Sequence, residues 1–349
     1  MSRTGQPIDD EFAFIRDVSE HFHTYHRKTL VPSGDDAAVY LPGERQGQIV
    51  CVDTLVEGIH FKRETLSPSQ IGYKSLAVNL SDIAAMGGQP KYFLVSVAIP
   101  AHWSQSELHD LYLGMKKLAD TWQVDLLGGD TVASPEHLVL SVTAIGEVDQ
   151  DVRLLRSNAG ADDVVFVTGT LGDSAAGLDF LLHRPEPGDR HHEEHPLCAD
   201  RLLRAHQWPE PHIQQGRLLA EFGRKASIAL NDVSDGIASE AHEIAVQSRV
   251  DLILKKESLP LSPELKRYAQ ASQKDPYEWA LFGGEDFVLS GTVPRRLLRE
   301  VQGRFQADQL AFYPIGTVRP GEGSVWLESN GSKQPLRHRG FNHFHPPRK

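Results

Sequence analysis

Short apolar runs alternate along this chain with longer stretches in which apolar residues recur every three or four positions. The short runs predict strands, because turn residues such as Pro and Gly bound them. They fall at residues 37–41, 48–53, 92–99, 138–148, 164–168, 228–230, 251–254 and 286–293. The longer stretches predict helices at residues 12–22, 67–86, 104–121, 172–182, 213–222 and 237–248. Such an alternation is typical of the α/β fold class.

Two of the predicted helices begin with recognisable N-terminal signals. Ser67 is followed by Pro68, a residue that the first turn of a helix accepts. Ser104 is followed three residues later by Glu107, the pattern of a capping box. The first of these helices is expected to end at Gly87 and Gly88.

The length of the chain and a break in its periodicity predict two domains. At about 150 residues per domain, 349 residues correspond to two. The apolar pattern is interrupted near residues 149–160, by the acidic stretch 149–151 and the polar stretch 158–163. We therefore predict two α/β domains, residues 1–150 and residues 151–349.

An excess of acidic residues restricts the partners of this protein. The chain has 36 Lys and Arg against 47 Asp and Glu, which gives a formal net charge of −11. Nucleic acids and anionic membrane surfaces favour a basic face, so the composition argues against both. No stretch approaches the roughly 20 apolar residues of a membrane span.

Two further features favour the cytoplasm. The two cysteines, Cys51 and Cys198, provide neither a disulfide framework nor a cysteine-rich zinc site. Asp9, Asp10 and Glu11 lie where a signal peptide would have a positive head and an apolar run. We expect a cytoplasmic protein.

The common nucleotide-binding motifs are missing from the sequence. The dipeptide Gly-Lys never occurs, which excludes a phosphate-binding loop of the form GxxxxGK[ST]. The GxGxxG motif and the catalytic motifs of protein kinases are also absent. The sequence HEEH at residues 192–195 is one residue too short for HExxH, and we interpret it as solvated charge in a polar loop at 183–196.

Instead, the chain contains aspartates in tight, small-residue settings, at the ends of predicted strands or inside a predicted helix. They lie in GDDAA (34–38), CVDT (51–54), NLSDIAAMGG (79–88), GGDT (128–131) and NDVSDG (231–236). Each one alone has a simpler interpretation as a helix cap or an Asx turn. Asp82 is the most unusual, because it interrupts an apolar helix face formed by Leu76, Leu80, Ile83 and Met86.

Taken together, these aspartates predict a cation site. Carboxylates that are brought together repel one another and bind protons unless a hard cation holds them. Oxygen ligands without interleaved His or Cys suit Mg²⁺, which also takes phosphate oxygens as ligands. The sequence therefore predicts a magnesium–phosphate site.

The motifs around the aspartates resemble those of the thiamine-monophosphate kinase family, in the same order and across both halves of the chain. The matching stretches are GDDAAV (34–39), DTLVEGIHF (53–61), KSLAVNLSDIAAMGG (74–88), LLGGDT (126–131), LRS (155–157), VTGTLGDSAAGL (167–178), NDVSDGIASE (231–240), FGGEDF (282–287) and GFNHF (340–344). The superfamily also contains aminoimidazole ribonucleotide synthetase and selenophosphate synthetase. The resemblance implies ATP-dependent phosphorylation of thiamine monophosphate to thiamine diphosphate with several Mg²⁺ ions.

The resemblance also implies roles for individual residues, by their positions in the family motifs. The implied metal ligands are Asp36, Asp53, Asp82, Asp130, Asp232 and Asp235, with Asp35 as a weaker one and the backbone carbonyls of Cys51 and Val52 as others. The implied nucleotide contacts are Tyr112, Gly129, Asp130, Arg156 and Ser234. The implied substrate contacts are His60 and Glu285, with His338 or Phe341 near the place of an aromatic residue that contacts the thiamine rings.

The fold that the resemblance implies is a pair of α/β domains of the aminoimidazole ribonucleotide synthetase-like type. The N-terminal domain binds ATP and Mg²⁺, and its sheet pairs with that of a second subunit in a homodimer. The C-terminal domain closes over the substrate. The chemistry implied is direct in-line transfer assisted by Mg²⁺, with no general base and with Arg156 holding a phosphate.

Two other functions are compatible with parts of the pattern. One is a sister activity of the superfamily, such as selenophosphate synthesis or ATP-dependent ring closure. Selenophosphate synthesis calls for a reactive cysteine near the N-terminus, and residues 1–30 contain none. The other is a binding module without activity, which would be favoured if several of the aspartates were missing, and all are present.

Overall fold

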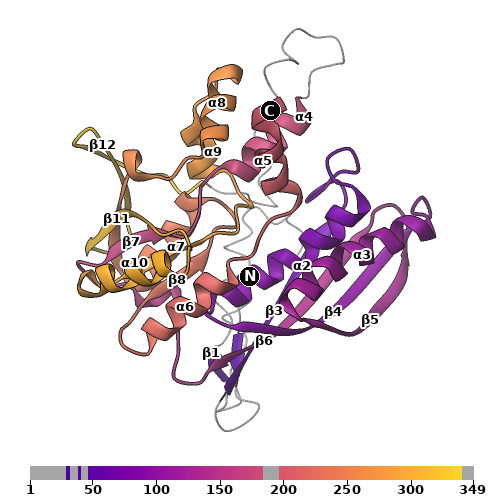
Figure 1. Ribbon diagram of the computed structural model, residues 1–349, viewed down its shortest axis with the longest axis horizontal. Coiled ribbons are helices and arrows are strands. Elements are labelled where there is room, and N and C mark those ends of the chain that lie inside the picture. The colour runs from indigo at the N-terminus through magenta and orange to yellow at the C-terminus, as the bar shows by residue number, and fades with distance from the viewer. Residues whose placement is uncertain (1–28, 32–37, 41–45, 184–195, 340–349) are drawn as a thin grey trace, which may run out of the picture.

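The computed structural model describes residues 29–31, 38–40, 46–183 and 196–339. These residues form two β-sheets with helices packed against them (Figure 1). The mixed α/β architecture confirms the predicted fold class. No helix in the described ranges is long and apolar enough to cross a membrane.

The first sheet comes from the N-terminal part of the chain, in the strand order β1-β2-β3-β6-β4-β5. Its neighbouring strands are antiparallel except β4 and β5, which are parallel and are connected through helix α3. Helices α2 and α3 cover the same face of this sheet (Figure 1). The bounds are β1 (Thr29–Val31), β2 (Ala38–Tyr40), β3 (Gln46–Val56), α2 (Pro68–Ala85), β4 (Gln89–Pro100), α3 (Gln105–Trp122), β5 (Asp125–Ser134) and β6 (Val139–Asp149).

The second sheet has the order β13-β12-β9-β11-β7-β10-β8, and its strands are antiparallel except for the pair β12 and β9. Its strands are β7 (Val164–Val167), β8 (Ala229–Asp232), β9 (Val250–Lys255), β10 (Leu289–Val293), β11 (Tyr313–Pro320), β12 (Val325–Ser329) and β13 (Ser332–Pro335). The accompanying helices are η1 (Arg156–Asn158), α4 (Asp173–Leu182), α5 (Pro196–Gln207), α6 (Ile213–Gly223), α7 (Ile237–Ser248), η3 (Lys256–Ser258), α8 (Pro263–Ser272), α9 (Pro276–Phe282), η4 (Arg295–Leu297) and α10 (Leu298–Ala307).

Strand β7 explains why the second sheet carries helices on both faces. All four of its residues are buried, and successive side chains of a strand point to opposite faces. Val164 and Phe166 belong to the core cluster that contains the apolar residues of α6 and α10. Val165 and Val167 belong to a second cluster with the apolar residues of α7. A strand buried on both faces is continuously apolar, as its sequence VVFV is.

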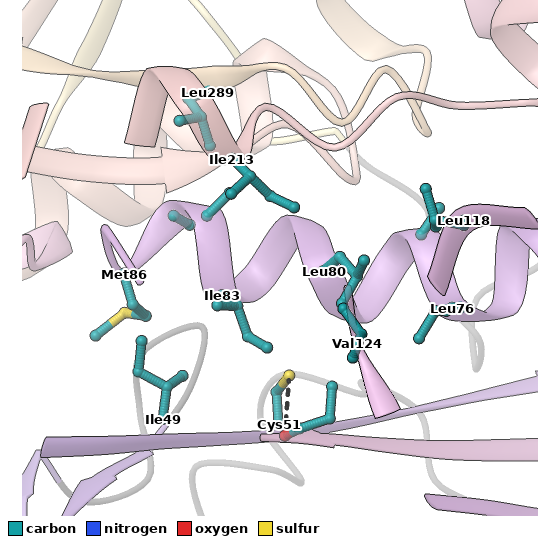
Figure 2. Packing of buried hydrophobic residues seen from close by; sticks show 14 of the residues in the cluster. Ile49, Cys51, Leu76, Leu80, Ile83, Met86, Leu118, Val124, Ile213 and Leu289 are labelled. Carbon is teal, nitrogen blue, oxygen red and sulfur yellow. Dashed lines mark hydrogen bonds between the residues drawn. The ribbon is translucent and has the colours of Figure 1, made fainter. Parts of the chain in front are cut away.

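Helix α2 lies between the first sheet and the C-terminal part of the chain. Leu76, Leu80 and Ile83 are fully buried, with Ile49 on one side of the helix and Ile213 on the other (Figure 2). Glycines allow close approach of backbones, because a Cβ at Gly216 of α6 would lie 2.1 Å from the carbonyl oxygen of Ala84. This packing carries the polar residues of α2 into the interior.

Local signals in the sequence predicted several element boundaries correctly. Ser67 and Ser104 cap α2 and α3, and each forms the reciprocal hydrogen bonds of a capping box. In the first box, Gln70 takes the place of the usual Glu and accepts a hydrogen bond from the Ser67 amide at 2.8 Å. The predicted helices at 172–182, 213–222 and 237–248 are confirmed as α4, α6 and α7.

Other expectations were wrong or incomplete. Strand β3 continues to Val56, so Asp53 lies inside a strand and not at its end. Asp130 lies within β5, a strand that the glycine-rich sequence did not predict. Strand β10 begins at Leu289, because Asp286 instead accepts a hydrogen bond from the Gly172 amide at the start of α4, at 2.7 Å.

Several elements of the second half were not predicted at all, namely α5, α8, α9, α10, β11, β12 and β13. The predicted helix at 12–22 and most of the polar loop at 183–196 lie outside the described residues.

Candidate active site

Three of the predicted aspartates converge from three different elements. Asp82 comes from α2, Asp53 from β3, and Asp232 from the last position of β8. The carboxyl groups of Asp53 and Asp82 share a hydrogen bond. The Ser81 hydroxyl donates to Asp232 Oδ2 at 2.6 Å, which joins α2 to the second sheet. The cluster therefore lies where the two parts of the chain meet.

The electrostatics of this cluster disfavour ionised carboxylates. Burial, with the charge of Asp232, raises the pKa of Asp53 to about 6. Burial and the charges of Asp53 and Asp232 raise the pKa of Asp82 well above its usual range. The pKa of Asp232 is also raised by burial, although the Ser81 hydrogen bond and the charge of Arg156 oppose the shift. A bound cation would reverse this preference for protons.

The immediate surroundings add acceptor oxygens and no reactive thiolate. Burial and the charge of Asp82 raise the pKa of Cys51, whose thiol donates to the Asn79 carbonyl at 3.4 Å. The side-chain oxygen of Asn79 is buried and accepts no hydrogen bond in the described structure. Such a set of oxygens suits a hard cation. However, no three His, Cys, Asp or Glu side chains of the described residues already form a metal-binding group.

The loop after β8 is organised by Glu240 of α7. Its carboxylate accepts from Asn231 Nδ2 at 2.5 Å, from the Asp235 amide at 2.9 Å and from the Ser234 hydroxyl at 3.4 Å. Burial, with the charge of Asp235, raises the pKa of Glu240 to about 8, while Arg156 acts in the opposite direction. Arg156 therefore lies near the Asp232–Asp235 loop.

Glu285 lies in the loop that follows α9 and precedes β10. Its backbone has a φ of 67°, and its amide donates to the Ser234 carbonyl at 2.7 Å. Its carboxylate contacts Lys74 Nζ at 2.7 Å and His206 Nδ1 at 3.3 Å. Glu285 is therefore attached to the same loop that carries Ser234 and Asp235.

The other two described residues that were predicted to contact the substrate, His60 and His338, each contact neighbouring residues of the chain. His60 follows β3, and its Nδ1 accepts a hydrogen bond from the Val56 amide at 2.9 Å. His338 lies beside α7, with its ring 5.3 Å from that of His242 and its Nε2 3.4 Å from the Ser239 hydroxyl. Asp35, Asp36 and Phe341 lie outside the described residues.

A second group of predicted residues lies at the far edge of the first sheet. Asp53 is opposite Val142, Val142 is opposite Val95, and Val95 is opposite Gly129 of the edge strand β5. At about 4.8 Å per strand, these three steps place Gly129 about 14 Å from Asp53. Asp130 is exposed and accepts a hydrogen bond from the Thr131 amide. One chain therefore does not bring Asp130 to the other aspartates.

Beside this edge is a cavity of about 550 Å³ between α3 and β5. Tyr112, Leu113 and Met115 of α3 line it together with Phe93 and Leu126. Glycine is required at residue 129, because a Cβ there would lie 1.8 Å from the Val95 carbonyl oxygen. The side chains that line the cavity include several apolar ones, as in sites that take a flat ring.

A larger cavity, of about 980 Å³, lies between the first sheet and helices α6 and α10. Several charged residues that line it are paired with one another, Arg224 with Asp149 and Lys225 with Glu300. Because these charges are already paired with one another, we consider the carboxylate cluster the stronger candidate for the active site.

Four residues of the site were not singled out by the sequence, namely Lys74, Ser81, His206 and Glu240. Lys74 had a local signal, since it is a charged residue in a helix that is otherwise apolar or small. Ser81 and Glu240 lie inside the motif stretches but have common helix or cap interpretations. His206 had no local signal, because its partner is far away in the sequence.

The chain is similar to known proteins over nearly its full length. The AIR synthase related protein N-terminal domain matches residues 34–148, and the corresponding C-terminal domain matches residues 160–327. Thiamine-monophosphate kinase of Bacillus subtilis (strain 168) is 44% identical over 336 residues, covering 96% of this chain and 99% of that protein. The enzyme of Aquifex aeolicus (strain VF5) is 34% identical over 322 residues, covering 91% and 95%.

A solved structure shows the same likeness. AaThiL complexed with AMPPCP and TMP superposes with a TM-score of 0.81 at 32% identity, covering 98% of this chain and 100% of that one. Both halves of the chain are matched, and the relatives are matched over nearly their full length. The chain therefore belongs to the AIR synthase related family and, within it, to the thiamine-monophosphate kinases.

Proposed function

We propose that this protein transfers the terminal phosphoryl group of ATP to thiamine monophosphate, giving thiamine diphosphate and ADP. The observation that carries the proposal is the convergence of Asp53, Asp82 and Asp232 in a chain of this family. The complex of AaThiL with TMP and AMPPCP, an analogue of ATP, supports both substrates.

The residues of the site fit a direct transfer. The phosphate of thiamine monophosphate is already an anion, so the acceptor needs no general base. The main obstacle is the repulsion between two phosphate groups, together with their in-line alignment. Arg156 contributes positive charge beside Asp232, and its planar guanidinium suits a phosphate. We infer that no phosphorylated enzyme forms.

The donor set fits Mg²⁺. The ligands that we propose are Asp36, Asp53, Asp82, Asp130, Asp232 and Asp235, with Asp35 and the carbonyls of Cys51 and Val52 in addition. Support comes from the raised pKa values of three of these carboxylates and from the buried oxygen of Asn79 that lacks a donor. When bound, the ions supply the positive charge that offsets the phosphates.

We further propose a homodimer in which two chains complete each site. Two strands, β6 and β4, separate Asp130 and the Tyr112 cavity from the strand that carries Asp53, so a second copy is the simplest source of Asp130. Apolar side chains are exposed along both regions, with Val52 60% exposed on β3 and Leu127 56% exposed on β5. Exposed apolar residues of this kind favour an interface.

The remaining functional roles are divided between the two predicted domains. Residues 1–150 would bind ATP and Mg²⁺ and form the dimer, and residues 151–349 would close over the substrate. Glu285 and His60 would contact thiamine monophosphate, with His338 or Phe341 near its rings. Gly129, Arg156 and Ser234 would contact the nucleotide. We propose a cytoplasmic location, which the small number of cysteines supports.

The Tyr112 cavity gives a direct test of nucleotide binding. Loss of a base–aromatic contact weakens binding by roughly 10-fold, so Tyr112→Ala should raise KM for ATP by about that factor. The KM for thiamine monophosphate should change by less than about 2-fold. Tyr112→Phe retains the ring and is the matched control. Equal changes in both KM values would show that the cavity does not take the adenine.

The activity itself is tested by magnesium-dependent release of ADP. We expect release with ATP and thiamine monophosphate together, and its loss when EDTA removes divalent ions. Aminoimidazole precursors and selenide should give no release above background. Turnover with either of these, and none with thiamine monophosphate, would identify a sister activity instead.

A further inference from the structure

The most unusual buried charge outside the carboxylate cluster is Lys74. Its side chain is 1% exposed, and it is among the largest fully buried side chains of the described residues. Burying an ammonium group costs several kcal/mol unless a partner of opposite charge offsets the lost hydration. Within the described residues, that partner is Glu285, which lies 211 residues away in the sequence. The pair therefore joins α2 to the loop before β10.

A second buried residue contacts the same oxygen of Glu285. His206 of α5 is 2% exposed, and its Nδ1 lies 3.3 Å from Oε2, the atom that Lys74 also contacts. Burial and the charge of Lys74 lower the pKa of His206, which keeps the ring neutral near pH 7. A neutral ring with its proton on Nδ1 has two acceptors within reach, Oε2 at 3.3 Å and the Ser174 hydroxyl at 3.4 Å. Two side chains from two helices thus contact one oxygen of the carboxylate.

The other carboxylate oxygen of Glu285, Oε1, has a different environment. No described residue donates a hydrogen bond to Oε1, and the side chain as a whole is 30% exposed. The backbone is also fixed, because the Glu285 and Phe287 amides donate to the carbonyls of Ser234 and Val233 at 2.7 and 2.9 Å. Oε1 is therefore an oriented acceptor attached to the loop that carries Ser234.

This arrangement keeps the acceptor ionised. Burial alone raises the pKa of Glu285, but the charge of Lys74 and the contact with His206 outweigh burial and lower it to about 2. Asp286 is the other charged group close to Glu285, and it is held by the amides of Gly172 and Ser174 at the start of α4. Removal of Lys74 would leave burial, the largest influence on this pKa and one that favours the protonated acid, opposed by His206 alone.

Thiamine monophosphate has one group with N–H donors, the amino group of its pyrimidine ring. We propose that Lys74 and His206 are positioning residues that fix Glu285 so that Oε1 accepts a hydrogen bond from this amino group. The inference rests on the proposed function, because it assigns Glu285 to the substrate. It adds that the ring end of the substrate is recognised only when α2, α5 and the loop before β10 are packed together.

The experiment compares Lys74→Met with Lys225→Met, which removes an exposed lysine from its ion pair with Glu300. Loss of a charge-assisted hydrogen bond corresponds to about 10-fold or more, so Lys74→Met should raise KM for thiamine monophosphate by at least about that factor. KM for ATP should stay within about 2-fold. The variant should also acquire a rise in KM for thiamine monophosphate between pH 7.5 and 5.5, as Glu285 takes up a proton. The unchanged protein and Lys225→Met should lack this rise.

His206 provides a second test that does not depend on the folding of Lys74→Met. Asn places a side-chain N–H near the position of the histidine Nδ1, whereas Leu provides no donor. His206→Leu should raise KM for thiamine monophosphate several-fold, and His206→Asn should restore it. If the unchanged enzyme turns over thiamine monophosphate but these variants lose only thermal stability, with KM unaltered, the two residues are merely structural. No turnover by the unchanged enzyme would instead refute the proposed function.

Discussion

The Asp82→Asn variant is expected to lose about 10³-fold in kcat and, without divalent cations at pH 8, to melt at a higher temperature than the unchanged protein. Asn has nearly the shape of Asp but no charge, so it cannot serve as an anionic ligand. It also removes a half-buried carboxylate whose ionised form is disfavoured by burial and by two neighbouring aspartates. Removal of this unfavourable carboxylate is expected to raise Tm by about 2 °C or more.

The sign of the pH dependence follows from the raised pKa of Asp82. In the absence of cations, the folded state binds this proton more tightly than the unfolded state. The protein therefore loses stability as the pH rises through the folded pKa, and the advantage of the variant should grow with pH. Added Mg²⁺ should reverse the order of the melting temperatures, because it stabilises only the chain that binds it.

Thermal melting with and without Mg²⁺, at pH 6 and pH 8, together with steady-state kinetics, measures these effects. Asp110→Asn is the matched control, since Asp110 is an exposed aspartate of α3. It should change neither kcat nor the response to Mg²⁺. An Asp82→Asn variant that retains activity, or that is destabilised at pH 8 without Mg²⁺, would contradict the role assigned to the cluster.

A dimer that carries Asp82→Asn in one chain and Asp130→Asn in the other should regain about half of the activity of the unchanged dimer. Each variant alone should be nearly inactive. If each site takes Asp82 from one chain and Asp130 from its partner, the mixed dimer contains one site with both changes and one site with neither. If both residues act within one chain, both sites of the mixed dimer are damaged.

Two different affinity tags allow the mixed dimer to be purified after co-expression. The control is a mixed dimer of Asp53→Asn and Asp82→Asn, which should stay inactive because these residues meet within one chain. Sedimentation of the unchanged protein checks the dimer itself. A monomer at micromolar concentration, or an inactive mixed dimer of the Asp82 and Asp130 variants, would refute the shared site.

Features that depend on neighbouring residues were predictable from the sequence. The capping boxes of Ser67 and Ser104 form between residues three positions apart, so their patterns are visible locally. Asp82 was recognisable because a charge in an apolar helix requires a special environment. The motif positions also implied Asp53 and Asp232, and the structure brings both to Asp82.

Features that depend on pairing between distant segments were not predictable in the same way. Strand β5 is exposed along nearly its whole length and contains Gly128 and Gly129, so it lacks the apolar pattern of a buried strand. Asp286 resembled the start of a strand, but its hydrogen bonds to the start of α4 depend on how α4 and β10 pack.

The sequence by itself determined the fold class, the helices with clear caps, and the supply of carboxylates for a hard cation. Only the tertiary structure decided which carboxylates meet, because burial of α2 against both parts of the chain places Asp82 between Asp53 and Asp232. It also decided that Asp130 lies three strands away from them. The same packing buries Lys74 beside Glu285. These two residues are 211 positions apart, so no local pattern in the sequence could predict that they form a pair.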